Sequence, residues 1–148
     1  GSYEKLSVNL VSLHRMEFNI RKLNPSDYDD VLVKWWKDWG FEPPRKDFLP
    51  EEGEGGLMVL LNNKPICAGF IYFTNSKVSW IEWIISDKDH RIERKKTLKM
   101  LIENLTSVSK KNGMKYIFAN NNNRFLIETY LNLDFKKGNI STELIKIL

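Results

Sequence analysis

The sequence is poor in the features that mark disulfide-bonded, metal-binding or membrane-spanning proteins. Its 148 residues include one cysteine, Cys67, and two histidines, His14 and His90. A single cysteine cannot form an internal disulfide, and histidines so far apart along the chain do not have the spacing of a zinc site. No apolar run approaches the roughly 18 residues that predict a transmembrane helix. We therefore expect a cytoplasmic protein that is stabilised by its hydrophobic core alone.

Internal repeats and linkers are also absent, and the only low-complexity stretch is four consecutive asparagines at 120–123. A chain of this length with 42% hydrophobic and 28% charged residues is typical of one globular domain. Gly1 and Ser2 resemble a cloning remnant, and Met16 resembles a native start. We interpret residues 1–15 as vector-derived or disordered, and 16–148 as the domain.

The net charge of +4 is modest, but the positive charge has one concentration at the start of a predicted helix. This basic cluster comprises Lys88, Arg91, Arg94, Lys95, Lys96 and Lys99. It has three readings: a solvated helix start, a site for a phosphorylated cofactor, or a nucleic-acid surface. A nucleic-acid partner is possible but is not the favoured reading.

Hydrophobic periodicity predicts the secondary structure. Apolar residues at helical spacing predict helices over 28–39, 91–111 and a segment after Asn123, and a short helix is expected around 47–49 within the loop 41–56. Alternating or continuous apolar runs predict strands at 17–23, 57–61, 66–73, 78–85, 116–119, 135–137 and 140–147.

This order predicts the fold class, an α/β mixed sheet with helices on both faces. The strands 57–61, 66–73 and 78–85 are joined by short turns and should form an antiparallel meander. The strand at 78–85 and the strand at 116–119 are joined through a helix, so they should be parallel with a right-handed crossover.

Short motifs add a family resemblance to this order. Asn123 is followed seven residues later by Tyr130 and then by Leu133-Asp134-Phe135, and the strand at 80–85 carries a glutamate, Glu82. This pattern resembles the GCN5-related N-acetyltransferase (GNAT) superfamily over residues 17–148, with Asp134 where the family has glycine. The resemblance implies an acetyl-CoA-dependent N-acetyltransferase that acts by direct attack of an amine acceptor in a ternary complex.

The catalytic candidates are Tyr130 and Glu82. By resemblance, Tyr130 protonates the departing thiolate, although a tyrosine on an amphipathic helix can also belong to the core. A carboxylate among the apolar residues of its strand is costly to bury. Facing a cleft, Glu82 could accept the proton of the amine, directly or through a water. It could equally be an outward-facing or ion-paired residue.

The resemblance also implies a pyrophosphate site at the start of the long helix, where unpaired backbone amides and the helix dipole attract phosphate. The family's glycine-containing motif aligns with either Arg91 or Arg94, and both alignments lack the glycines. Basic side chains there could block phosphates or bind them. The implied cofactor-binding residues are Ile84, Ile85, Arg91, Arg94, Lys95, Lys96, Thr97, Lys99 and Asn123, the last of which is also a plain N-cap candidate.

Trp35, Trp36, Trp39 and Phe41 come from the region where the family builds its acceptor site, so they are substrate-binding candidates as well as core candidates. Two other functions stay open: a catalytically inactive GNAT-fold binding or inhibitory protein that has lost its glycines, and a small nucleic-acid-associated protein that uses the basic cluster. A monomer and a homodimer are both compatible with the sequence.

Overall fold

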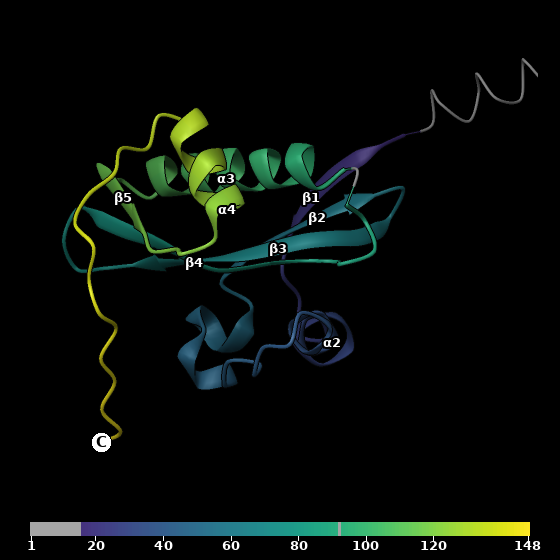
Figure 1. The fold of residues 1–148 in the computed structure, drawn as a ribbon, viewed down its shortest axis with the longest axis horizontal. Helices are drawn as coiled ribbons and strands as arrows, with labels where there is room; N and C mark the ends of the chain where they lie inside the picture. Colours follow the sequence, from purple (N-terminus) through teal and green to yellow (C-terminus); the bar gives the residue numbers. More distant parts are fainter. Residues whose placement is uncertain (1–15, 92) are drawn as a thin grey trace, which may run out of the picture.

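The computed structural model describes residues 16–91 and 93–148, so the interpretation of residues 1–15 lies outside the described residues. Five strands form one sheet in the order β1-β2-β3-β4-β5 (Figure 1). The antiparallel pairing of β2, β3 and β4 and the parallel pairing of β4 with β5 are as predicted, and β1 pairs antiparallel with β2. Their bounds are Phe18–Lys22, Gly56–Leu61, Lys64–Phe73, Val78–Ser86 and Tyr116–Ala119.

Helices cover both faces of this sheet, which confirms the predicted mixed α/β architecture (Figure 1). Helix α2 and two 3-10 turns lie on one face, and α3 and α4 lie on the other. The bounds are Val33–Asp38 for α2, Lys46–Phe48 and Pro50–Gly53 for the 3-10 turns, Arg94–Lys111 for α3 and Arg124–Asn132 for α4. Among the described residues, no helix is both long and apolar enough to cross a membrane.

The alternation of side chains along the strands creates two cores. On the α2 side, Leu32, Trp35 and Trp36 pack against Met58 and Phe70. On the α3 side the buried cluster contains Val59, Cys67, Ile71, Ile81, Leu98, Leu101, Ile102, Leu105 and Tyr130. Because β3 is covered on both faces, its residues at 66–71 are all buried, which explains why this strand reads as a continuous apolar run.

Helix α3 lies very close to β3 at Gly69. A Cβ atom at this position would stand 3.2 Å from a methyl group of Leu101 and 3.3 Å from one of Leu105. It would also stand 3.1 Å from Ile84 on β4. The absence of a side chain at Gly69 therefore sets how closely α3 approaches the sheet.

The helix predicted over 28–39 forms, but its first turn, Tyr28–Leu32, has π-helical hydrogen bonding. Helix α3 begins at Arg94 rather than at residue 91. The chain before it is held in a turn, in which the backbone amide of His90 donates to the carbonyl oxygen of Asp87 at 3.2 Å.

The two strands predicted at 135–137 and 140–147 are not formed, and this prediction was wrong. Phe135 instead packs its ring against Tyr130, with ring centroids 4.9 Å apart. Residues 136–148 are all exposed and have no regular secondary structure. The apolar and β-branched residues of the tail indicate β propensity, but a strand also needs a neighbour to pair with, and the tail has none among residues 16–91 and 93–148.

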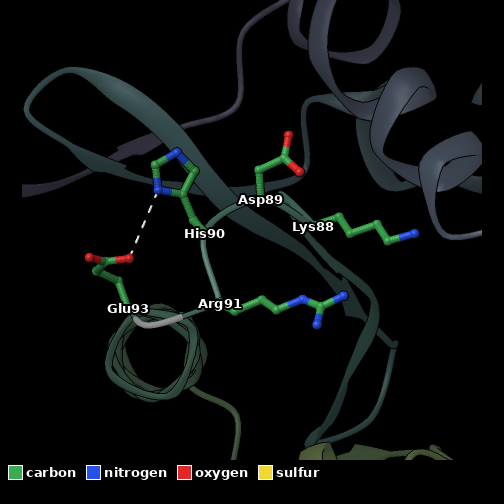
Figure 2. Close-up of a pocket in the computed structure, with 5 residues that line it drawn as sticks. All are labelled: Lys88, Asp89, His90, Arg91 and Glu93. Atoms are coloured by element: carbon green, nitrogen blue, oxygen red, sulfur yellow. Dashed lines mark ion pairs between the residues drawn. The ribbon is translucent and has the colours of Figure 1, made fainter.

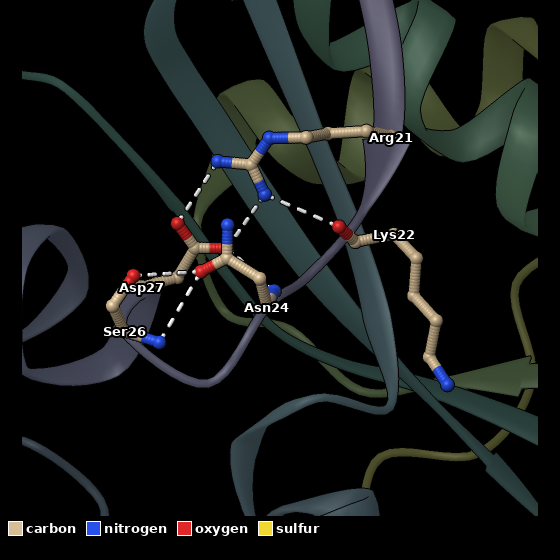
Figure 3. Close-up of polar contacts among 5 residues, drawn as sticks. All are labelled: Arg21, Lys22, Asn24, Ser26 and Asp27. Atoms are coloured by element: carbon tan, nitrogen blue, oxygen red, sulfur yellow. Dashed lines mark hydrogen bonds and ion pairs between the residues drawn. The ribbon is translucent and has the colours of Figure 1, made fainter.

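A buried ion pair fixes the entry to the first helical segment (Figure 3). The two terminal nitrogens of Arg21 donate to the carboxylate of Asp27 at 2.7 and 2.9 Å, and the backbone amide of Asn24 donates to the same carboxylate at 2.8 Å. Asp27 is 3% exposed. Its side chain makes no capping hydrogen bond to the helix and instead ties the loop back to β1.

We expect the replacement Asp27→Ala to destabilise the fold by roughly 2–4 kcal/mol, because it leaves the half-buried guanidinium of Arg21 and the amide of Asn24 without their acceptor. Urea denaturation followed by circular dichroism measures this change. Asp47→Ala is the matched control, since Arg45 makes two hydrogen bonds of 3.1 Å to Asp47 on the exposed surface. Equal shifts in the unfolding midpoint for the two variants would contradict a structural role specific to Asp27.

Candidate active site

A cleft opens where β4 and β5 part. Their parallel pairing runs from Val78 opposite Tyr116 to Ile81 opposite Ala119 and ends there. Strand β4 continues to Ser86, whereas the chain after Ala119 turns through the asparagines 120–123 into α4. The edge of β4 beyond Ile81 therefore loses its neighbour, and a cavity of about 1450 Å³ lies along it.

A β-bulge in β4 contributes to this separation. The register with β3 passes from Phe70 opposite Glu82 to Ala68 opposite Ile85, so β4 advances three residues where β3 advances two. Trp83 takes a left-handed backbone conformation at φ 59° to accommodate the extra residue. Bulges bend and twist the strand that contains them. Ile84 and Ile85, two of the predicted cofactor-binding residues, follow directly and line the cavity.

Glu82 and Tyr130 line the same cavity from opposite elements, β4 and α4. Burial, with a smaller contribution from the negative charge of Glu143, raises the pKa of Glu82 to about 7, while a hydrogen bond from the backbone amide of Asn120 acts in the opposite direction. Burial, together with the charge of Glu82, raises the pKa of the Tyr130 hydroxyl well above its usual value. The site thus holds a carboxyl group that titrates near neutrality and a phenol that stays protonated.

The remaining contacts of Tyr130 leave its hydroxyl available. Its ring is 7% exposed and packs edge-on against Phe135. Among residues 16–91 and 93–148, no hydrogen bond to the Tyr130 hydroxyl is formed. A protonated, unpaired hydroxyl at a cleft is a suitable proton donor.

Asn123 begins α4. Its side-chain oxygen accepts a hydrogen bond from the backbone amide of Leu126 at 3.0 Å, so it acts as an N-cap, one of the two roles that the sequence left open. Asn123 also lines the cavity. The cap sets the direction of α4 and so carries Tyr130, two turns later, to the cleft.

Arg94, the first residue of α3, stands across the mouth of the cleft. Its guanidinium lies 5.2 Å from the ring centre of Trp39 and 5.3 Å from that of Phe125. Trp39 is held in place because its indole nitrogen donates to the carbonyl oxygen of Ser86 at 2.8 Å. The buried Nε of Arg94 has no hydrogen-bond partner in the described part of the chain. An unsatisfied cationic donor beside a helix N-terminus is favourable for an anionic group.

The rest of the predicted basic cluster does not converge on this cleft. Arg91 lines a separate pocket of about 600 Å³ with Lys88, Asp89, His90 and Glu93. Figure 2 shows His90 and Glu93 facing each other across this pocket, at 3.9 Å, while the side chains of Lys88 and Arg91 extend in the other direction. Lys88 and Arg91 therefore lie at a different site from Arg94.

The other predicted cofactor-binding residues of α3 make local contacts. Lys96 lies 4.4 Å from the ring centre of Phe18, Lys99 pairs with Glu103 at 4.0 Å, and Lys95 is exposed. Thr97 is fully buried and donates to the backbone of the preceding helical turn. These positions give no common basic face of the kind that a nucleic acid requires.

The aromatic candidates divide between core and cleft. Trp35 is 4% exposed and packs in the core on the α2 side. Trp36 is equally buried but has an edge on the cavity, and Trp39 and Phe41 line it more openly. Cys67 is fully buried, and burial raises the pKa of its thiol to about 12, so it has no nucleophilic character.

Sequence reasoning did not single out Trp83 or Phe125. Trp83 is exposed, and its indole nitrogen donates to the Tyr72 hydroxyl at 2.8 Å. The signal for the bulge was the loss of alternation after Glu82, where three apolar residues follow one another. Phe125 gave no signal, because its role depends on a side chain that is distant in sequence, Arg94.

Comparison by sequence identifies no relatives. No family model matches the chain, and no curated protein matches it. The similarity that exists is therefore structural.

Several solved acetyltransferase structures share the architecture. Glucosamine-6-phosphate N-acetyltransferase from Arabidopsis thaliana has a TM-score of 0.63 at 16% identity, over 87% of this chain and 98% of that one. The ribosomal-protein-S18-alanine N-acetyltransferase from Escherichia coli has a TM-score of 0.64 at 18% identity, over 83% and 80%. An aminoglycoside acetyltransferase from an uncultured soil metagenomic sample has a TM-score of 0.61 at 15% identity, over 88% and 96%.

At these identities the similarity establishes the architecture. It agrees with the resemblance carried by Asn123, Tyr130 and the glutamate of β4, and these residues now lie around one cleft. The chain therefore has the fold of the GCN5-related N-acetyltransferases.

Proposed function

We propose that the protein is an acetyl-CoA-dependent N-acetyltransferase that acts on an amine acceptor. The observation that carries this proposal is the meeting of Glu82 and Tyr130 in the cleft where β4 and β5 part. One group has its pKa moved to about 7 and the other is kept protonated, which is the pairing that acid–base catalysis requires. The fold supports the same activity.

The residues present fit acetyl-CoA. The unpaired edge of β4 at Ile84 and Ile85 offers backbone groups to an extended chain, and Arg94, whose Nε has no partner among the described residues, offers a cationic side chain to a phosphate. The absence of glycines at the start of α3 is offset by this arginine, whose side chain is oriented by Trp39 and Phe125. When bound, acetyl-CoA supplies a thioester whose acetyl group passes to the amine, with release of a thiolate.

Two side chains of this protein transfer protons during this reaction, one as acceptor and one as donor. Glu82 in its ionised form accepts a proton from the amine, directly or through a water, so that the nitrogen can form the new amide bond. Tyr130 donates its proton to the sulfur as the carbon–sulfur bond breaks. The apolar side chains that bury both groups exclude water and strengthen their interactions.

The acceptor side of the cleft is formed by Trp39, Phe41 and Trp83, with Glu82 and Glu42 among the cavity residues. Aromatic faces and carboxylates together favour a cationic amine. In this proposal Trp39 and Phe41 contact the acceptor, Trp36 supports them from the core, and Trp35 has a structural role.

We expect calorimetric titration with acetyl-CoA to show binding that weakens roughly 10- to 100-fold in Arg94→Ala, the loss typical of a charge-assisted hydrogen bond. Coenzyme A alone should behave similarly. Lys110→Ala, at the opposite end of α3, is the control and should bind as wild type does. Wild-type protein that binds neither ligand at millimolar concentration would favour the inactive binding or inhibitory protein over the enzyme.

Glu82→Gln should lower kcat/KM by about 10²- to 10⁴-fold, because glutamine cannot accept the proton. In wild type the rate should rise with pH through about 7 as Glu82 ionises, and this limb should be missing from the pH profile of the variant. Glu128→Gln, on the exposed side of α4, is the control. An unchanged profile in Glu82→Gln would place the base elsewhere.

The same variant has a second measurement that does not need an acceptor. The pKa of Glu82 is raised on folding, so its neutral form contributes stability below about pH 4.5 that is lost as the pH rises through about 7. At pH 8 we expect Glu82→Gln to be more stable than wild type by about 1–2 kcal/mol, after allowance for partial exposure. Equal urea midpoints at pH 8 would contradict the burial argument.

Tyr130→Phe should lower kcat by at least roughly tenfold and leave the affinity for acetyl-CoA nearly unchanged, because the ring packing against Phe135 is kept and only the proton is lost. Tyr116→Phe is the control, since this tyrosine is 60% exposed on β5. Steady-state kinetics with matched calorimetry separates the two effects. Wild-type turnover in Tyr130→Phe would remove this residue from the mechanism.

A further inference from the structure

At the β5 end of the sheet, a row of aromatic side chains is exposed on one face. Tyr72 on β3 is the register partner of Trp80 on β4, and Trp80 is the register partner of Phe118 on β5, so the three share a face. Tyr116 lies two residues before Phe118, on the same face and about 7 Å along the strand. The rings of Trp80 and Phe118 meet edge-on, with centroids 5.0 Å apart. We call these four residues the aromatic row.

The aromatic row is on the side of the sheet where α2 lies, because Phe70, two residues before Tyr72, belongs to the core on that side. Figure 1 shows α2 at the other end of the sheet and, in the described part of the chain, no helix beneath β5. Tyr116 and Phe118 are accordingly 60% and 49% exposed. None of the four residues lines the cavity of the candidate active site. The row is therefore a separate apolar surface, and such surfaces mark interaction sites.

Hydrogen bonds hold the aromatic row in place at both ends. The hydroxyl of Tyr72 donates to the carbonyl oxygen of Phe48 at 2.7 Å and accepts from the indole nitrogen of Trp83 at 2.8 Å. At the other end, the backbone amide of Tyr116 donates to the carbonyl oxygen of Lys77 at 3.1 Å. Rings that are already fixed on a sheet lose little freedom when a ligand stacks on them.

The chain around the aromatic row is positively charged. From 104 to 127 it has four basic residues and no aspartate or glutamate, and from 55 to 81 it has two basic residues and again no acidic one. Lys77 and Lys115 directly precede β4 and β5, and a backbone hydrogen bond of 2.8 Å joins them. Both side chains are exposed, and neither forms an ion pair with a residue that the structure describes. The carboxylate that shares this face of β4, Glu82, lines the cavity instead.

Exposed aromatic rings beside unneutralised lysines fit one class of ligand. Every nucleobase has a flat face that can stack on an aromatic ring, and the phosphates between the bases attract lysines. A duplex keeps its base faces stacked inside, and an acidic peptide has no such faces. Proteins that read single strands on a sheet use two or three exposed aromatic rings in this way.

We propose that the aromatic row, with Lys77 and Lys115, is a binding surface for a single-stranded nucleic acid. Tyr116 and Phe118 stack on bases, and the lysines contact the phosphates. The rings are about 7 Å apart along β5, twice the roughly 3.4 Å between bases of a helix, so the bound bases are separated from one another. This surface lies at the C-terminal end of α3, opposite the basic cluster. The inference does not depend on acetyl transfer.

Fluorescence anisotropy with the full chain tests the proposal. The labelled probes are oligothymidine and oligouridine of about 12 nucleotides, a DNA duplex of the same length, and polyglutamate as a polyanion without bases. We expect at least one single strand to bind roughly tenfold or more tightly than the duplex, and the comparison of the two strands identifies DNA or RNA as the preferred ligand. Polyglutamate should not bind.

Phe118→Ala and Tyr116→Ala should each weaken single-strand binding roughly 5- to 100-fold, because each removes a stacking ring. Tyr116→Phe keeps its ring and should bind as wild type does. Phe73→Ala, at an exposed ring on the opposite face of β3, is a second control. The mutated side chains are exposed, so the circular dichroism and urea midpoints of these variants should stay close to those of wild type.

The double variant Lys77→Gln with Lys115→Gln tests the phosphate contacts. It should reduce the slope of log Kd against log salt concentration by about 1.4, since each contact with a single strand contributes about 0.7. Lys95→Gln with Lys99→Gln, in the basic cluster, is the matched control and should leave the slope unchanged.

Three results would overturn the proposal. The first is a wild-type protein that binds neither single strand, or that binds the duplex or polyglutamate equally well. The second is wild-type affinity in both Phe118→Ala and Tyr116→Ala. The third is a loss of binding in the control pair of the basic cluster but not in the pair Lys77 and Lys115, which would place the nucleic acid at the other end of α3.

Discussion

The separation of β4 from β5 after Ile81 is the constraint on which the rest of the site depends. A parallel pair that stayed hydrogen-bonded along the whole of β4 would leave no space for an extended ligand and no free backbone edge. Here the bulge at Trp83 bends one strand, and the polar run at 120–123 takes the other chain away toward α4. Ligands of open α/β sheets are commonly found where neighbouring strands diverge in this way.

The positions of the ionisable groups around the cleft depend on that separation. Glu82 lies on β4 directly after Ile81, the last residue that pairs with β5, and Tyr130 is carried toward it by a helix whose direction is set by the cap at Asn123. Because both groups are shielded from water by the same apolar surroundings, their pKa values move upward together. Arg94 approaches from a third element, and the two aromatic rings that flank it limit the directions in which it can bind an anion.

The sequence predicted the strands β1 to β5 and the three main helices because each carries a hydrophobic pattern that its own packing explains. Asn123, Tyr130 and Glu82 were proposed from a resemblance whose motifs are local to one strand and one helix, and the structure places all three around one cavity. The cation–π contacts of Arg94 could not be predicted, because its partners Trp39 and Phe125 lie on elements that only the tertiary fold brings together. The strands at 135–137 and 140–147 failed because pairing is a property of two strands, and a single sequence describes only one of them.

Gly69 links these features through packing rather than through chemistry. It sits on β3 opposite the bulge, with Ile84 on one side and two leucines of α3 on the other, each about 3.1–3.3 Å from the place where a methyl group would stand. A single added carbon would push against the bent strand and the helix that presents Arg94 at the same time. The absence of a side chain at this interior position thus sets the spacing between β4 and α3. A substitution at the rim of the cleft would change only what the cleft contacts, whereas any side chain at position 69 would disturb the packing that supports it from behind.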